Sequence, residues 1–175
     1  MTTASERYDR TARLLHWLIA GLVIANLLTG LFHEAFEGVV RLIPLHKSLG
    51  LAILALTLVR IAWRLTWTHP PFPPNVTPAE ATAARMVQGT FYGLMLAMPL
   101  TGWIMASAGK YPLTWFGLID VPKLAVTQTD PAYLVGRSAH EVLGWLFAAL
   151  AVLHVAAALR HHFVLRDRVL QRMLG

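Results

Sequence analysis

Four long apolar runs, separated by polar or proline-containing connections, organise this chain. The runs cover about residues 14–32, 46–65, 84–108 and 138–163. Each holds close to the roughly 20 helical residues that cross the hydrocarbon core of a bilayer. The pattern therefore predicts an all-α integral membrane protein, in which four helices form one bundle and one domain over residues 1–175.

The connections between the runs differ in composition. Residues 66–82 contain five prolines, which favour an extended polyproline connector over a helix. The longest connection, residues 109–136, is rich in proline, glycine and aromatic side chains. We expect this segment to cap one end of the bundle at the membrane surface.

Composition agrees with a membrane location. Of the 175 residues, 56% are hydrophobic and 14% are charged, whereas a soluble domain carries about 25% charged residues. The chain has no cysteine, which excludes disulfides, thiolate ligands and covalent haem attachment. The net charge of +6 comes from arginines and lysines that flank the apolar runs, so it indicates membrane topology rather than a nucleic-acid partner.

The distribution of positive charge predicts an orientation. With four spans, the N-terminus, the second connection and the C-terminus lie on one side of the membrane. That side holds ten of the fifteen lysines and arginines. Because positive residues accumulate on the cytoplasmic side, both termini are expected to be cytoplasmic.

Four histidines lie within or at the ends of the apolar runs. An ionisable side chain at membrane depth is costly and therefore indicates a function. Alternating helix directions place His16 and His154 at one depth, towards the cytoplasm, and His46 and His140 at a second depth, towards the outside. The two histidines of the last run are fourteen residues apart, about 21 Å along one face of a helix. The topology thus predicts two imidazole pairs in two layers.

Two imidazoles that face each other from different helices suit axial ligation of haem iron. A single membrane histidine could equally bond a neighbouring helix, and zinc also binds imidazole. Zinc normally takes four protein ligands, however, and Glu141 is the only further candidate ligand at the depth of either histidine pair. Gly50 and Gly144 each follow a histidine by four residues on the same helix face, so we expect them to let a porphyrin edge approach.

His161 follows His154 by seven residues and shares its helix face, about 10 Å nearer the cytoplasm. It could donate a hydrogen bond to a haem propionate or to a quinone carbonyl. The alternative is a solvated histidine at the membrane interface, beside His162.

At this point the sequence resembles the bacterial cytochrome b561 family over almost its whole length. The matching motifs are Arg13-Leu-Leu-His16-Trp17, Leu45-His46-Lys47-Ser48-Leu49-Gly50, His140-Glu141 and Leu153-His154 running on to His161-His162-Phe163. The resemblance implies a multi-pass protein of the bacterial inner membrane. It also implies two b haems, one held by His16 and His154 and the other by His46 and His140.

The short four-helix members that this chain resembles oxidise superoxide and reduce ubiquinone. If this chain does so, Lys47, Lys110 and Arg137 on the outer side are expected to attract the superoxide anion. The alternative is a cytochrome b relay or anchor subunit that passes electrons between a periplasmic redox partner and the quinone pool. The connection 109–136 is long enough to dock such a partner.

Overall fold

The computed structural model describes residues 8–36, 38–66, 71–72 and 76–174. Its long helices are α1 (Arg10–Leu31), α2 (Leu42–Thr66), α3 (Pro78–Ser107) and α4 (Pro131–Arg160). The short elements are β1 (Thr114–Trp115), β2 (Ile119–Asp120), the π-helix η1 (His161–Leu165) and α5 (Gln171–Leu174).

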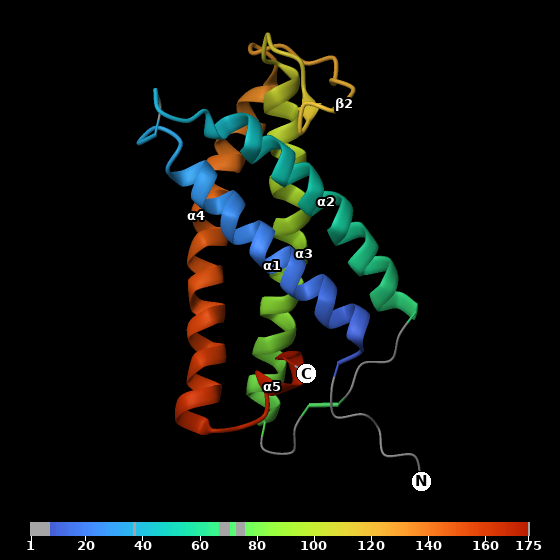
Figure 1. Ribbon diagram of the computed structural model, residues 1–175, viewed down its shortest axis with the longest axis vertical. Coiled ribbons are helices and arrows are strands. Elements are labelled where there is room, and N and C mark those ends of the chain that lie inside the picture. Colours follow the sequence, from blue (N-terminus) through green and yellow to red (C-terminus); the bar gives the residue numbers. More distant parts are fainter. Residues whose placement is uncertain (1–7, 37, 67–70, 73–75, 175) are drawn as a thin grey trace.

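The four long helices form a bundle of two crossed pairs. In Figure 1, α1 and α2 run obliquely in front of α3 and α4. All four helices contribute to one small apolar core between the pairs. Its buried residues are Ile19, Val23, Ile53, Leu94, Met95 and Phe147.

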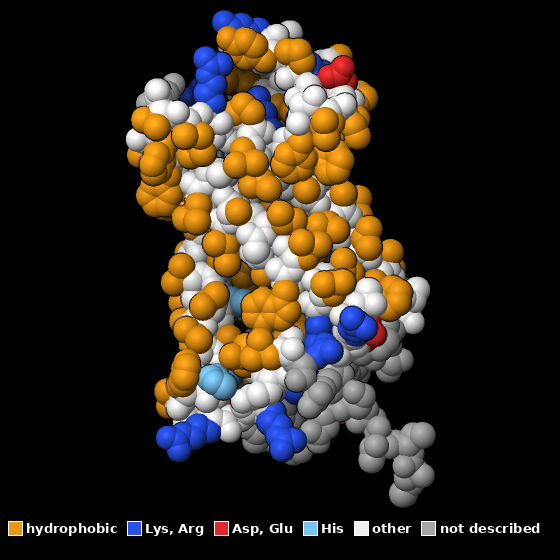
Figure 2. Space-filling model, viewed as in Figure 1, with side chains coloured by type: hydrophobic (Ala, Val, Ile, Leu, Met, Phe, Trp, Pro, Cys, Tyr) orange, Lys and Arg blue, Asp and Glu red, His pale blue; other side chains and the backbone are white. Residues whose placement is uncertain are grey.

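Most of the apolar surface faces outwards. Each of the four long helices is long and apolar enough to cross a membrane. Only a small share of the most apolar segment of each helix is buried inside the protein, from 6% in the last helix to 22% in α2. Figure 2 shows hydrophobic side chains across the middle of the visible face and Lys and Arg side chains at its two ends. An apolar girdle with cationic ends is the surface of a protein that spans a bilayer. The predicted four-helix membrane bundle is confirmed.

The two ends of the described chain meet at one end of the bundle. The backbone N–H of Tyr8 donates to the carbonyl of Arg172 at 3.3 Å. The indole N–H of Trp17 donates to the carbonyl of Met173 at 2.9 Å. Four spans therefore bring the terminal segments together, while the cytoplasmic location of that end remains a prediction.

All four long helices begin earlier than the apolar pattern predicts. α2 begins at Leu42 rather than at residue 46 and holds Pro44 in its first turn. Side-chain caps set the starts of α1 and α3, and α4 begins with proline. Thr77 and Glu80 form a reciprocal capping box before α3, and Pro78 occupies its first turn. The predicted connector over 66–82 is therefore wrong for 78–82, and its residues 67–70 and 73–75 lie outside the described part of the chain. Proline also opens α4, at residue 131 rather than 138. Proline is favoured in a first turn, where its missing N–H is not needed.

α1 shows the same effect at the start of the chain. It begins at Arg10 rather than at residue 14, because the Asp9 carboxylate accepts a hydrogen bond from the backbone N–H of Ala12 at 3.1 Å. A carboxylate at this position satisfies an N–H that has no partner within the helix.

The connection between α3 and α4 is ordered over the end of the bundle opposite the terminal segments. Its β1–β2 hairpin turns at Phe116 and Gly117, both with positive φ. The backbone N–H of Phe116 donates to the Ser48 hydroxyl of α2 at 2.9 Å, and that of Leu124 donates to the Ser107 hydroxyl of α3 at 3.0 Å. Two buried serines thus hold this connection against the helix ends.

The absence of cysteine from the chain gives a direct test of orientation. Leu118 in the hairpin is 82% exposed and Leu174 in α5 is 60% exposed. In intact spheroplasts, a membrane-impermeant maleimide should label Leu118→Cys, and should label Leu174→Cys only after permeabilisation. The cysteine-free parent is the control. Labelling with the opposite sidedness would show that the termini are outside.

Candidate functional site

The first histidine pair lies at the end of the bundle covered by the hairpin. His46 comes from the first turns of α2 and His140 from α4. Their ring centroids are 6.0 Å apart and the ring planes are inclined by 84°. The rings therefore face each other across the bundle from two helices that are not consecutive in the chain.

Backbone hydrogen bonds orient both rings of this pair. Nδ1 of His46 lies 3.0 Å from the carbonyl oxygen of Asn26, and Nδ1 of His140 lies 3.1 Å from that of Met98. A carbonyl oxygen only accepts, so each Nδ1 carries the proton and each Nε2 keeps its lone pair. Histidines that ligate metals are held in this way, through a second nitrogen that donates to a carbonyl.

The second pair lies near the terminal segments. His16 of α1 and His154 of α4 have ring centroids 6.4 Å apart and planes inclined by 65°. Aromatic neighbours flank the pair, since Trp17 lies 5.2 Å from His16 and Phe91 lies 5.1 Å from His154, measured between ring centroids.

The spacing within both pairs fits one metal ion between two imidazoles. A metal–imidazole bond is about 2 Å long, so two bonds in line separate the ring centres by roughly 6 Å. Among the described residues, no group of three or more His, Cys, Asp or Glu side chains could hold a metal ion. A tetrahedral zinc site needs such a group, whereas haem iron with two axial ligands does not.

Glycines allow the helices to approach the first pair. A Cβ atom at Gly30 of α1 would lie 2.7 Å from Cε1 of His46, and one at Gly102 of α3 would lie 3.1 Å from Cε1 of His140. Both positions escaped the sequence analysis, because they lie on different helices from the histidines that they contact.

Gly50 and Gly144, the two glycines that the sequence predicts to pack against haem, lie near side chains other than the histidines. A Cβ at Gly50 would lie 3.7 Å from the Asn26 side chain, and one at Gly144 would lie 3.6 Å from Cε of Met98. Both are ordinary contact distances, so a Cβ atom would fit at either glycine. Their role in packing against haem remains a prediction.

Arginines surround the end of the bundle that holds the second pair. Nε and Nη1 of Arg13 are buried and have no hydrogen-bond partner among the described residues. Arg13 lies one helical turn before His16, and side chains three residues apart are neighbours on a helix. A buried guanidinium needs an anionic partner. The two propionates of a haem would supply carboxylates of this kind.

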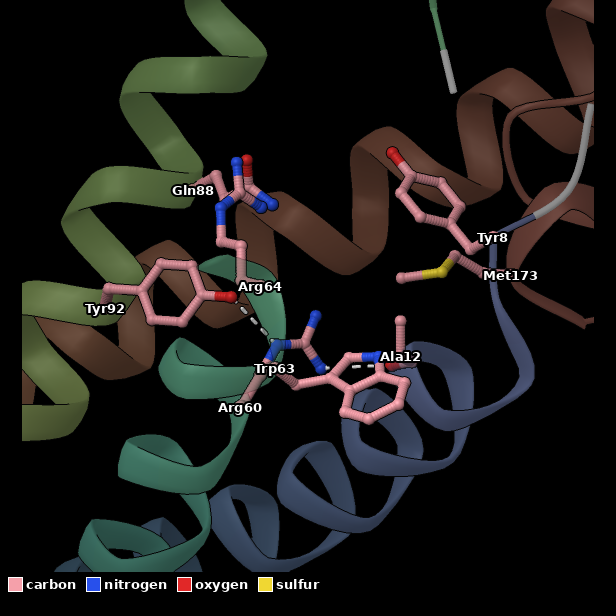
Figure 3. A pocket seen from close by; sticks show the side chains of 8 residues that line it. All are labelled: Tyr8, Ala12, Arg60, Trp63, Arg64, Gln88, Tyr92 and Met173. Carbon is pink, nitrogen blue, oxygen red and sulfur yellow. Dashed lines mark hydrogen bonds between the residues drawn. The ribbon is translucent and has the colours of Figure 1, made fainter. Parts of the chain in front are cut away.

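A small pocket at the same end is also electropositive. Figure 3 shows Arg60 between α1 and α3, donating to the Tyr92 hydroxyl at 3.1 Å and to the Ala12 carbonyl at 3.5 Å. Arg64 lies over the Tyr92 ring, 5.8 Å from its centroid. None of the eight residues drawn is acidic. The Asp9 carboxylate, however, accepts a hydrogen bond from the indole N–H of Trp63 at 2.9 Å, so the positive charge of the two arginines is partly offset.

His161 lines a second cavity, of about 100 Å³, at the end where the termini meet. The cavity is bounded by Tyr8, Phe72, Val76, Glu80, Ala84, His161, Val169 and Arg172. Half of these side chains are apolar and the others can form hydrogen bonds. Binding sites for small organic molecules combine apolar walls with a few polar groups in this way.

The cations selected for the outer end lie around the hairpin. Lys47 is half-buried and lies close enough to Lys123 for their like charges to repel. Lys123 itself donates to the carbonyls of Gly109 and Tyr111. Lys110 and Arg137 are exposed. Lys123 was not among the cations selected from the sequence, because its proximity to Lys47 depends on how the hairpin folds back over α2.

Comparison with known proteins identifies the family. The model of the prokaryotic cytochrome b561 family matches residues 7–175. The chain belongs to this family. It is 33% identical to cytochrome b561 homolog 2 of Escherichia coli, over 99% of this chain and 94% of that protein. It is 31% identical to the probable superoxide oxidase CybB of Yersinia pestis, over 91% of each chain. A cytochrome b562 of Cereibacter sphaeroides is 32% identical, over 98% of each chain.

The cytochrome is therefore a multi-pass protein of the bacterial inner membrane that binds b-type haem and transfers electrons. The resemblance seen in the sequence motifs and the membrane location inferred from the apolar runs are both confirmed. The ring spacing of both histidine pairs is compatible with this cofactor.

The contact between Gly30 and His46 generates a prediction about this cytochrome. Gly30→Ala would place a methyl group 2.7 Å from the His46 ring and should displace the imidazole, weakening haem binding at the outer pair. The optical spectrum and the haem content of the purified protein measure the effect.

Gly21→Ala is the matched control, because a Cβ atom at Gly21 of the same helix meets nothing within 4 Å. It should keep the wild-type spectrum and haem content. Equal haem loss from both variants would attribute the effect to the helix rather than to the histidine.

Proposed function

We propose that this cytochrome carries two b haems and transfers electrons from superoxide, on the periplasmic side, to ubiquinone. The haems supply the one-electron redox chemistry that links the two half-reactions. Superoxide becomes dioxygen by losing one electron, and ubiquinone becomes ubiquinol by gaining two electrons and two protons.

The observation that carries this proposal is the presence of two histidine pairs at two depths of one bundle. His140 and His154 are separated by fourteen residues of α4, about 21 Å along the helix. Each has a partner ring at 6.0 or 6.4 Å from a different helix. Two stacked redox sites would allow a donor at one membrane surface and an acceptor at the other.

The outer end supports an anionic donor. Lys47 and Lys123 lie close together. The order of the helices places Lys110 and Arg137 at the same end of the bundle, and both are exposed. A cluster of like charges focuses the electric field and speeds the encounter with a small anion. The similarity to the Yersinia pestis protein named as a probable superoxide oxidase also supports superoxide as this donor.

The opposite end supports a quinone acceptor. The cavity beside His161 has apolar walls formed in part by Phe72, Val76 and Val169. The planar head group of a quinone is apolar except for its two carbonyl oxygens, which accept hydrogen bonds. We assign His161 as the donor to one of these carbonyls.

A relay function is the second candidate, and the hairpin is the observation that favours it. Tyr111, Leu118 and Ile119 are 68%, 82% and 56% exposed. Apolar side chains grouped on one surface can mark a protein-binding site. In this case a periplasmic redox protein, rather than superoxide, would be the donor.

The number of haems and the histidine pairing are directly testable. Pyridine haemochrome analysis should give about two haems per chain, one for each bis-histidine site. In redox titrations, His16→Ala and His154→Ala should lose the same component, and His46→Ala and His140→Ala the other. One haem per chain would contradict the proposal. Losses shared between His16→Ala and His46→Ala would contradict the pairing.

Superoxide as the donor predicts a dependence on charge and ionic strength. Lys110→Glu should slow reduction of the haems by superoxide by about 2- to 10-fold without changing haem content, because it weakens the attracting field. Added salt should also slow the wild-type reaction, since salt screens surface charges over about 8 Å at physiological ionic strength. Stopped-flow spectroscopy at several salt concentrations measures both effects.

Arg10→Glu is the control, because Arg10 is exposed in the first turn of α1 at the opposite end of the bundle. It should leave the superoxide reaction unchanged. Slow reduction of the wild type by superoxide, insensitive to salt and to Lys110→Glu, would favour the relay function.

A further inference from the structure

His161 and Asp167 form a short hydrogen-bonded pair at the end of α4. Nδ1 of His161 lies 2.5 Å from Oδ2 of Asp167. The side chains are 20% and 6% exposed, respectively. The pair is therefore largely removed from water, although it lies at the end of a membrane helix.

The local backbone holds the carboxylate in position. After the π-helix η1, Arg166 adopts a left-handed conformation with φ of +52°, and the chain turns back. The N–H of Asp167 then donates to the carbonyl of His161 at 3.2 Å, and Oδ1 of Asp167 accepts from the N–H of Val169 at 2.9 Å. Both the main chain and the side chain of Asp167 are thus tied to the residues around His161.

This arrangement determines which imidazole nitrogen can meet a ligand. An ionised carboxylate only accepts, so Nδ1 of His161 carries a proton directed at Asp167. Nε2 is the remaining nitrogen, and the ring lines the cavity of about 100 Å³. A carboxylate behind a histidine fixes the tautomer and the orientation of the ring, as in hydrolases that use the imidazole to move a proton.

We infer that Asp167 positions His161 as the proton donor to a quinone bound in this cavity. This inference rests on the proposed function and deepens it, because ubiquinone reduction consumes protons as well as electrons. His161 takes up a proton at Nε2 from cytoplasmic water, forms an ion pair with Asp167, and gives that proton to a quinone carbonyl oxygen.

The overall step is balanced in electrons and protons. The quinone gains two electrons, supplied through the cytochrome by two superoxide anions that leave as dioxygen. One carbonyl oxygen receives its proton from Nε2 of His161, and the other receives its proton from water. Both carbonyls become hydroxyls, and His161 is protonated again from the cytoplasmic side.

Other ionisable groups line the same cavity, so the test must separate their effects from that of Asp167. Tyr8, Glu80 and Arg172 line it together with His161. The Glu80 carboxylate accepts hydrogen bonds from the backbone N–H and the hydroxyl of Thr77, at 2.9 and 2.8 Å. Its charge also interacts with His161. Glu80 is thus a second carboxylate near the imidazole, but it caps α3 instead of bonding to the ring.

The test separates the oxidising and reducing halves of the reaction. Haems reduced beforehand are mixed with a short-chain ubiquinone, and their reoxidation is followed by stopped flow at a series of acidic to alkaline pH values. Wild-type reoxidation should slow as the pH rises and should show a solvent deuterium isotope effect. Asp167→Asn should slow it by about tenfold or more, within the range that a positioned general acid contributes, and flatten the pH profile.

Two further variants control for structure and charge. Asp167→Glu should recover most of the rate, since it restores a carboxylate behind Nδ1. Glu80→Gln removes the other carboxylate that lines the cavity, so it measures the effect of lost charge alone. Its rate should fall less than that of Asp167→Asn, and the slowing with rising pH should remain. Haem content and the rate of reduction by superoxide should be unchanged in all three variants.

The outcomes distinguish this inference from the proposed function. If ubiquinone does not reoxidise the wild-type haems, both are overturned. If wild-type reoxidation is normal but lacks an isotope effect, or Asp167→Asn retains the wild-type rate and pH profile, only the role of the pair is overturned. An equal loss of reoxidation rate in Glu80→Gln and Asp167→Asn would also overturn it. The effect would then come from the loss of negative charge near the cavity rather than from the hydrogen bond to His161.

Discussion

The interaction on which this structure depends is the pairing of imidazoles across an apolar bundle. Hydrocarbon offers no hydrogen-bond partners, so a polar ring inside a membrane must find them within the protein. In the pair formed by His46 and His140, the carbonyls of Asn26 and Met98 each accept a hydrogen bond from one ring. The spacing of the two rings would accommodate one metal ion between them. A b-type haem held between the two rings would satisfy the remaining nitrogens, so we expect cofactor binding and bundle stability to be coupled.

The two ends of the bundle are built differently, and each construction suits a different kind of reactant. At the end that carries the hairpin, Ser48 and Ser107 hold the connection between α3 and α4 in place, and cations lie around it. A fixed positive surface suits a small anion that gives up an electron without binding deeply. At the other end, the terminal segments and α3 line an open pocket beside His161, which suits a larger, mostly apolar acceptor that also needs protons.

Much could be predicted because membrane insertion restricts the possible structures so strongly. The apolar runs alone specify four spans, and alternating helix directions sort the histidines by depth. The pairing of His16 with His154 and of His46 with His140 follows from depth without knowledge of how any helix is rotated. The early starts of the helices were missed, since capping by Asp9 and Thr77 and proline in first turns, rather than hydrophobicity, set where α1, α3 and α4 begin.

What the sequence alone determined, then, is the class of protein, the number of spans and the depth of each candidate ligand, because these depend on composition and on position along the chain. Helix rotation and loop path are properties of packing, and only the tertiary structure decided them. Gly30 contacts His46 from another helix, and Lys123 approaches Lys47 through the fold of the hairpin. Asp167 reaches His161 because a π-helix and one left-handed residue reverse the chain, a turn that no spacing of apolar residues encodes.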